Sequence, residues 1–256
     1  MTDEQAVLVD VSDGVMTITL NRPKAKNAVN LAVATAVAAA LEELDSNDDI
    51  RVAILTGAGG TFCAGMDLKA FVTGEMPVIP GRGFGGLAEK SPAKPLIAAV
   101  EGYALAGGLE LMISCDLIVA AEDAQFGITE VKRGLVAGAG GLMKLPRQIP
   151  PRLAMEMALL GDFSSAERAL GMGLINRVVP SGSALEGARE LAAKIAANGP
   201  LAVRVTKQVM MEQEDWSTAE MWAKQQALVN PVFVSEDAIE GATAFAETRA
   251  PNWKGT

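Results

Sequence analysis

The chain has 256 residues, half of them hydrophobic, which is enough for one large core or for a main domain with a helical appendage. Its formal charge is −9 at pH 7. An acidic chain binds nucleic acid or an anionic membrane poorly, so neither is expected as a partner.

The chain contains no histidine. This excludes a Ser-His-Asp or Cys-His catalytic site within one chain, and it excludes zinc sites that need imidazole. The two cysteines, Cys63 and Cys115, show neither metal-ligand spacing nor a disulfide framework, and we therefore expect a reducing, cytoplasmic location. Because Thr-Asp-Glu-Gln follows Met1, we expect no secretory segment, and the apolar stretch at 31–44 is too short to span a bilayer.

The first half of the chain alternates predicted strands with helices. Apolar runs at 6–11 and 15–20, joined at Asp13-Gly14, predict a β-hairpin. Asn30 is a predicted N-cap of a helix over 31–45. Further strands are predicted at 52–56, 96–100, 117–120 and 125–127, and a helix at 107–114.

The second half is mainly helical. Helices are predicted at 142–148, 152–159 and 165–172, with a last strand at 175–179. Three or four more helices are predicted between 183 and 247, with breaks at Asn198-Gly199-Pro200 and Asn230-Pro231. The sequence therefore predicts an α/β core over 1–182 and a helical region over 183–256, which packs on this core or on a neighbouring subunit.

Several Gly-rich stretches do not match nucleotide-binding patterns. Gly57-Ala58-Gly59 and Gly138-Ala139-Gly140 lack the third glycine of the dinucleotide fingerprint, where Phe62 and Met143 stand. Glu89 replaces the last glycine of a Walker-like stretch. These glycines are better suited to tight turns and close backbone approach.

Two other glycine-containing turns each follow a predicted strand and open a helix. They are the segments 63–68, Cys-Ala-Gly-Met-Asp-Leu, and 104–110, Ala-Leu-Ala-Gly-Gly-Leu-Glu. Free N–H groups at helix N-termini favour negative charge, so two such donors would make an oxyanion hole. Ordinary packing of strand against helix is the alternative explanation of these glycines.

Glu110 and Glu130 both lie among apolar residues. If both are buried and close together, one of them titrates at raised pH, and two like residues then supply an acid and a base. A helix N-terminal charge or a solvated carboxylate is the alternative for either one. With no histidine in the chain, acid–base chemistry near neutral pH falls to carboxylates, Lys, Cys or the single Tyr.

In combination, these segments resemble the crotonase (enoyl-CoA hydratase) superfamily over nearly the whole chain. The resemblance rests on segments 21–28, 62–69, 102–110 with Cys115-Asp116, 126–130 and 138–141. It implies an α/β crotonase (ClpP/crotonase-like) fold, a spiral of repeated β-β-α units. It also implies a C-terminal helical region that builds homotrimers, often paired into hexamers.

The resemblance implies a site as well. The N–H groups of Met66 and Gly107 would form the oxyanion hole, and Glu110 and Glu130 would be the catalytic pair of an enoyl-CoA hydratase. Such an enzyme adds water across the 2,3 double bond of an acyl-CoA thioester; it needs no metal or cofactor, because coenzyme A is part of the substrate. The substrate-binding candidates are Arg22, Lys24, Ala25, Lys26, Ala64, Asp67, Leu68, Lys69 and Gly108.

Two residues depart from the family pattern. Met66 stands where a small residue is frequent, so its side chain is expected to trim the acyl pocket. Ala106 stands where a glycine is frequent, and we expect this exchange to be harmless at a helix N-terminus.

Finer resemblances leave the acyl group open. Segments 83–87 and 245–255 resemble carnitinyl-CoA dehydratases, whereas segment 63–70 resembles actinobacterial hydratases that act on steroid side chains. Other open alternatives are a different crotonase reaction, such as enoyl-CoA isomerisation, and a non-catalytic acyl-CoA-binding or RNA-binding relative. The acidic charge weakens the RNA-binding alternative.

Overall fold

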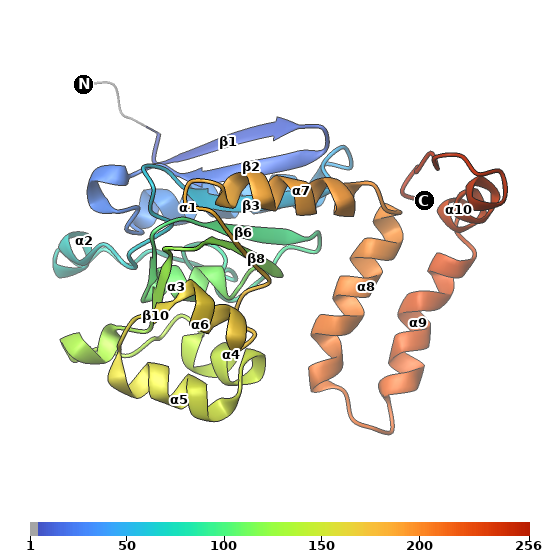
Figure 1. Ribbon diagram of the computed structural model, residues 1–256. Helices are drawn as coiled ribbons and strands as arrows, with labels where there is room; N and C mark the ends of the chain where they lie inside the picture. The colour runs from blue at the N-terminus through green and yellow to red at the C-terminus, as the bar shows by residue number, and fades with distance from the viewer. Residues whose placement is uncertain (1–4) are drawn as a thin grey trace.

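A computed structural model describes residues 5–256 (Figure 1). Residues 1–4, on which part of the prediction about a secretory segment rests, lie outside the described residues. The chain forms an α/β body, and two long helices, α8 and α9, run side by side at its edge, with the C-terminus beside α10 (Figure 1). Within residues 5–256, no helix has the length and apolar character needed to cross a membrane.

The main sheet has six strands in the order β1-β2-β3-β6-β8-β11. The hairpin of β1 and β2 is antiparallel, as predicted, and Asp13 and Gly14 turn it with φ of 52° and 75°. The other four strands join it in parallel. The strands are β1 (Val7–Ser12), β2 (Val15–Leu20), β3 (Val52–Gly57), β6 (Leu96–Val100), β8 (Leu117–Ala121) and β11 (Arg177–Val179).

The central strands of this sheet are buried on both faces. In β3, Ala53 and Leu55 join the main core, together with residues of α1 (Leu31–Ser46). Val52 and Ile54 point the other way, into a second cluster with α7 (Ala184–Ala196). Burial on two faces explains the unbroken apolar runs of these strands. Helix α7 thus packs on the sheet, while the predicted division of the chain at residue 183 stays a prediction.

A smaller sheet, in the order β10-β9-β7, lies beside the main one. Strands β7 (Tyr103–Leu105) and β9 (Gln125–Gly127) pair in parallel, and β10 (Ser164–Ser165) pairs with β9 in the antiparallel sense. The chain leaves β6 for β7 and then enters α3 (Gly107–Met112). It leaves β8 for β9 and then enters the 3-10 helix η2 (Glu130–Arg133). These are the repeated β-β-helix units that the family resemblance implies.

The remaining elements fill the space around these units. Short strands β4 (Val78–Ile79) and β5 (Gly83–Phe84) pair with each other. The other helices of the body are η1 (Pro23–Ala25), α2 (Leu68–Val72), α4 (Gly141–Gln148), α5 (Pro151–Leu160) and α6 (Ala166–Gly171). Those of the C-terminal region are α8 (Pro200–Glu212), η3 (Gln213–Asp215), α9 (Met221–Phe233) and α10 (Glu236–Ala246).

The predicted break at Asn230-Pro231 is wrong. Helix α9 runs through Pro231 to Phe233. Because Pro231 lies in the last turn, its missing N–H removes only one of the final hydrogen bonds, and the helix ends two residues later. The real break is at Ser235, whose side chain accepts a hydrogen bond from Ala238 N and so caps α10.

The C-terminal tail is fastened to the helices beside it. The buried carboxylate of Asp237 accepts hydrogen bonds from Lys254 N at 2.7 Å and Gly255 N at 2.9 Å. The indole of Trp253 donates to Ala197 O at 2.8 Å. The tail therefore has a defined path along α10, and the side chain of Lys254 pairs with Glu236 at 2.9 Å.

Candidate active site

A cavity of about 970 Å³ lies in the α/β body, where the N-terminal ends of several helices meet. Its wall is mainly apolar, with Phe71, Phe84 and Phe163 among the large side chains. The predicted site residues that line it are Lys26, Ala64, Met66, Leu68, Gly107, Glu110 and Glu130. One hollow thus brings together the two predicted N–H donors and the two predicted carboxylates.

Strand register explains why these groups meet. Cys63 pairs with Ala104 in a parallel bridge, and Ala104 pairs with Phe126 in the small sheet. The three residues form one row across three neighbouring segments. Each segment then leads into a helix within three to five residues, and these helices begin at Leu68, Gly107 and Glu130. Parallel pairing keeps these turns at the same edge of the sheet.

The backbone N–H groups of Met66 and Gly107 lie next to each other. A Cβ atom built on Gly107 would be 3.6 Å from Met66 N, and one built on Gly65 would be 3.4 Å from Gly107 N. Within residues 5–256, neither N–H group has a hydrogen-bond acceptor. Two unpaired donors at a helix N-terminus form a suitable place for a developing negative charge.

Glycine at 107 and 108 permits this close approach. A Cβ on Gly107 would lie 2.6 Å from the ring of Phe84, and a Cβ on Gly108 would lie 2.2 Å from the carbonyl oxygen of Cys63. Gly108 does not line the cavity, so the feature that the structure shows for it is close packing of α3 on the preceding segment.

The expectation that alanine at 106 is harmless stays a prediction, but the structure shows a conformational cost at this position. Ala106 has φ of 52° and ψ of −127°, a conformation that side chains other than glycine rarely adopt. Its N–H is bonded to Gly127 O at 2.8 Å, so the small sheet holds the turn in place. The turn that presents the Gly107 N–H therefore carries backbone strain.

Glu110 is buried, with 3% of its surface exposed, and its Oε1 accepts hydrogen bonds from Ala139 N at 2.8 Å and Gly141 N at 2.9 Å. Burial raises the pKa of Glu110, while these two bonds and the charge of Lys144 oppose the rise. The carboxylate form is therefore supported by directed donors at the start of α4.

Glu130 is buried to a similar degree, with 8% of its surface exposed, but its surroundings differ. Its Oε2 is buried and has no hydrogen-bond partner within residues 5–256. Burial, together with the nearby charge of Glu110, raises the pKa of Glu130 to about 7. Glu130 is therefore the member of the pair that keeps its proton near neutral pH.

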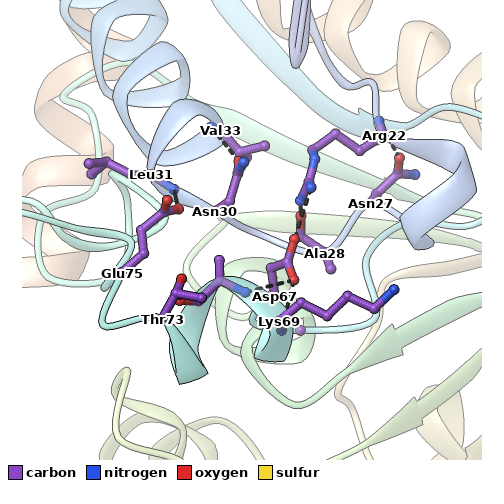
Figure 2. A network of polar contacts seen from close by, with 12 residues as sticks. Arg22, Asn27, Ala28, Asn30, Leu31, Val33, Asp67, Lys69, Thr73 and Glu75 are labelled. Atoms are coloured by element: carbon purple, nitrogen blue, oxygen red, sulfur yellow. Dashed lines mark hydrogen bonds and ion pairs between the residues drawn. The ribbon is translucent and has the colours of Figure 1, made fainter.

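Two predicted substrate-binding residues bind each other instead of facing the cavity. Figure 2 shows Arg22 paired with Asp67, with 2.8 Å between Nη2 and Oδ2. Asp67 also caps α2 by accepting from Lys69 N at 3.1 Å. Burial opposes ionisation of Asp67, but the hydrogen bond and charge of Arg22, together with the N–H groups of Ala70 and Lys69, outweigh it and hold the pKa of Asp67 below its usual range. Both side chains therefore fix the turn that leads out of segment 63–67.

The other predicted cations divide into two groups. Lys26 lines the cavity, and its Nζ lies 5.1 Å from the ring centroid of Tyr103. Lys24 and Lys69 are exposed and lie outside the cavity lining, as does Ala25. The binding roles of these residues stay predictions.

Sequence reasoning missed several residues of the cavity. They include Phe71, Phe84, Tyr103, Leu135, Val136, Lys144 and Phe163. Segment 138–141 was noted as a motif, but its task of holding Glu110 through two N–H groups depends on where α4 begins. Lys144 had no signal in the sequence, because a lone lysine after a glycine run is typical of a solvated helix face.

Comparison with known proteins shows the family of the chain. The model of the enoyl-CoA hydratase/isomerase family matches residues 10–256. The enoyl-CoA hydratase EchA19 of Mycobacterium tuberculosis is 44% identical, over 96% of both chains, and the carnitinyl-CoA dehydratase of Salmonella typhi is 43% identical, over 94% of this chain and 95% of the relative. The crystal structure of the enoyl-CoA hydratase EchA1 from Mycobacterium marinum superposes with a TM-score of 0.97 at 58% identity, over 99% of this chain and 100% of that one.

The chain thus belongs to the enoyl-CoA hydratase/isomerase family, and it has the crotonase fold. The predicted family and fold class are confirmed. The roles of the individual site residues stay predictions, which the geometry above makes testable.

Proposed function

We propose that the protein is an enoyl-CoA hydratase that adds water to the 2,3 double bond of an acyl-CoA thioester, reversibly and in the syn sense. The observation that carries this proposal is the unequal pair of buried glutamates beside two unpaired N–H groups in one cavity. A hydratase needs one group to accept a proton from water and another to give a proton to carbon. An isomerase needs only to move one proton.

The first step of the proposed reaction is polarisation of the thioester. The carbonyl oxygen accepts hydrogen bonds from Met66 N–H and Gly107 N–H. These donors stabilise the enolate that forms when water attacks Cβ, and one such donor typically contributes about 3 kcal/mol in the transition state. Because the donors belong to the backbone of packed turns, they need little reorganisation during the reaction.

The two glutamates complete the addition. The Glu110 carboxylate takes a proton from the attacking water while the oxygen of this water bonds to Cβ. Glu130 gives its proton to Cα, where the electron pair of the enolate forms the new C–H bond. Glu110 then releases its proton to solvent, and Glu130 takes up a proton from solvent, which restores both groups for the next turnover. Dehydration follows the same path in reverse, and no metal or redox cofactor takes part.

The substrate of this proposal is an acyl-CoA thioester with an apolar acyl group, because the cavity wall is mainly apolar. Dehydration of carnitinyl-CoA is a second candidate, favoured by the 43% identical relative that bears that name. The two candidates share the same acid, base and oxyanion donors and differ only in the acyl group that the cavity accepts.

The test is a hydration assay. Loss of absorbance of the conjugated enoyl thioester is measured for 2-enoyl-CoA substrates of short and long chains, with a steroid side chain, and with the carnitine-type acyl group. Hydration of any one supports the proposal, and the preferred one identifies the acyl group. A protein that hydrates none of them but converts 3-enoyl-CoA into 2-enoyl-CoA is an isomerase. A protein that binds acyl-CoA without turnover is a non-catalytic relative.

We further propose that the enzyme is a homotrimer or a dimer of trimers, located in the cytoplasm. Within this single described chain, no residue of α8 or α9 is buried, and the exposed fractions of Trp222, Phe233 and Phe245 are 68%, 76% and 89%. Apolar surface of this kind supports an interface between subunits. Light scattering coupled to gel filtration tests it, and a fully active monomer at micromolar concentration contradicts it.

A further inference from the structure

Lys144 connects the two helices that determine the position of Glu110. It lies on α4, one turn after the Gly141 N–H that binds the Glu110 carboxylate. Its Nζ donates to Ser114 Oγ at 2.7 Å, and the Ser114 hydroxyl donates to the Glu110 carbonyl oxygen at 2.7 Å. Lys144 therefore fastens the start of α4 to the end of α3.

A second hydrogen bond ties the same ammonium group to the loop after β5. Lys144 Nζ donates to Ala88 O at 2.6 Å, and Ala88 also lines the cavity. A Cβ built on Gly140 would lie 3.5 Å from Lys144 Cε, so the aliphatic stem passes over the turn that holds Glu110. With three segments joined at one atom, the side chain of Lys144 has little freedom.

Several groups act on the Glu110 carboxyl group. Burial raises its pKa, the N–H groups of Gly141 and Ala139 and the ammonium group of Lys144 on α4 lower it, and its charge in turn acts on Glu130 on η2. Cys115, at the end of α3, is the other titratable group that acts on Lys144, and burial raises the pKa of its thiol. A buried thiol stays neutral, so the positive charge is left to act on Glu110.

We propose that Lys144 is a positioning residue for the hydration reaction, which holds the Glu110 carboxylate against the start of α4 and keeps it ionised so that it acts as the base. The inference rests on the proposed function and adds a residue to it. In this role Lys144 acts through Glu110.

The experiment compares the pH dependence of kcat/KM for enoyl-CoA hydration in three variants. Lys144→Met removes the charge and the hydrogen bonds but keeps the stem. In this variant we expect the acidic limb of the pH profile of kcat/KM to move to higher pH by about one unit. We also expect kcat to fall about tenfold while KM changes little. Lys144→Arg keeps the charge, and its acidic limb should stay close to that of the wild type.

Arg147→Met is the matched control. It removes a cation from the same helix, one turn further on, where Arg147 is exposed and pairs with Glu214 at 3.2 Å. Its acidic limb should not move. A folded Lys144→Met with an unmoved limb overturns the proposal, as does an equal movement in Arg147→Met. If Lys144→Met does not fold, Lys144→Gln takes its place under the same criteria.

A measurement without turnover separates this proposal from the proposed function. The thermal midpoint at pH 7 is compared for Lys144→Met, Glu110→Gln and the double variant. If Lys144 and Glu110 are coupled, the thermal midpoint of the double variant falls by less than the sum of the two single decreases. Additive decreases overturn the proposal. A wild type that hydrates no enoyl-CoA contradicts the proposed function instead, and leaves this cycle interpretable.

Discussion

The surroundings of the two glutamates differ more than their burial does. Glu110 is met by two backbone N–H groups at the start of α4, and Lys144 lies nearby. Glu130 has a buried oxygen without a partner in residues 5–256. Under the proposed mechanism, the backbone around these two identical side chains suits them to opposite tasks, one as carboxylate and one as acid. The difference lies in the directed donors, since both carboxyl groups are buried.

The largest effect is expected from removing either carboxylate. Glu110→Gln and Glu130→Gln should each lower hydration at least ~100-fold, the usual scale for a positioned acid or base, with little change in substrate binding. Steady-state kinetics and direct binding of an acyl-CoA measure the two quantities. Glu122→Gln, at an exposed position after β8, is the matched control and should stay fully active. Near-full activity in either site variant would show that its assigned role is wrong.

A smaller loss is expected from disturbing only the Glu110 side of the pair. A Cβ at Gly141 would lie 3.0 Å from Glu110 Oε1 and 3.2 Å from Ile128 Cδ1. Gly141→Ala should therefore push the carboxylate away from its two N–H donors and reduce kcat about tenfold. Gly171→Ala is the control, because a Cβ there meets nothing within 4 Å. Equal activity of the two variants would mean that the position of Glu110 is not critical.

Replacing Glu130 is expected to change how the stability of the protein depends on pH. A carboxyl group with an ordinary pKa of 4.5 when unfolded and about 7 when folded favours the native state at low pH, and this contribution is lost as the pH rises through 7. Glu130→Gln should therefore be more stable than the wild type above pH 7, by on the order of 1–2 kcal/mol after allowance for solvent screening in the cavity.

Thermal or urea unfolding at pH 5 and pH 8 measures this difference. Near pH 5 the gain should shrink, because the wild-type carboxyl group is then protonated in the native state. A Glu130→Gln variant that is less stable than the wild type at pH 8 would show that the carboxylate is well accommodated there.

The smallest effect concerns the strained turn shared by both halves of the site. Ala106→Gly should stabilise the protein by about 0.5–1 kcal/mol, because glycine adopts the φ of 52° without strain and this gain exceeds its greater entropy when unfolded. Hydration should change less than about twofold. Ala193→Gly, at an exposed position in α7, should destabilise by about 1 kcal/mol, and urea unfolding measures both. If both variants change the free energy of unfolding in the same direction, Ala106 is not strained.

The sequence predicted the elements that carry strong local signals. The Asp13-Gly14 hairpin and the helix capped by Asn30 are where the pattern puts them, and Asn30 Oδ1 accepts from Val33 N at 3.1 Å. Strand β7 was missed, because three residues become a strand only by pairing with β9. The helix through Pro231 was missed because a proline near a helix end costs less than one in the middle.

The candidate site shows the same division. The glycines of segments 63–68 and 104–110 are visible in the sequence, and on that basis the sequence suggested N–H donors in both turns. The different surroundings of Glu110 and Glu130 were not visible in the sequence, since they depend on N–H groups at the start of α4 and just before it, about thirty residues further along the chain. Which carboxyl group ionises is decided by tertiary contacts, and sequence patterns do not record those.

The row formed by Cys63, Ala104 and Phe126 has a consequence for protein engineering. The proposed catalytic groups stand on three turns, with Gly107 and Glu110 both at the start of α3. The strand register that spaces these turns does not depend on the side chains at residues 110 and 130, so those side chains can change while the register stays. The oxyanion donors can be kept as a constant part while residues 110 and 130 are randomised, and selection with thioester substrates can then search for new chemistry without rebuilding the scaffold.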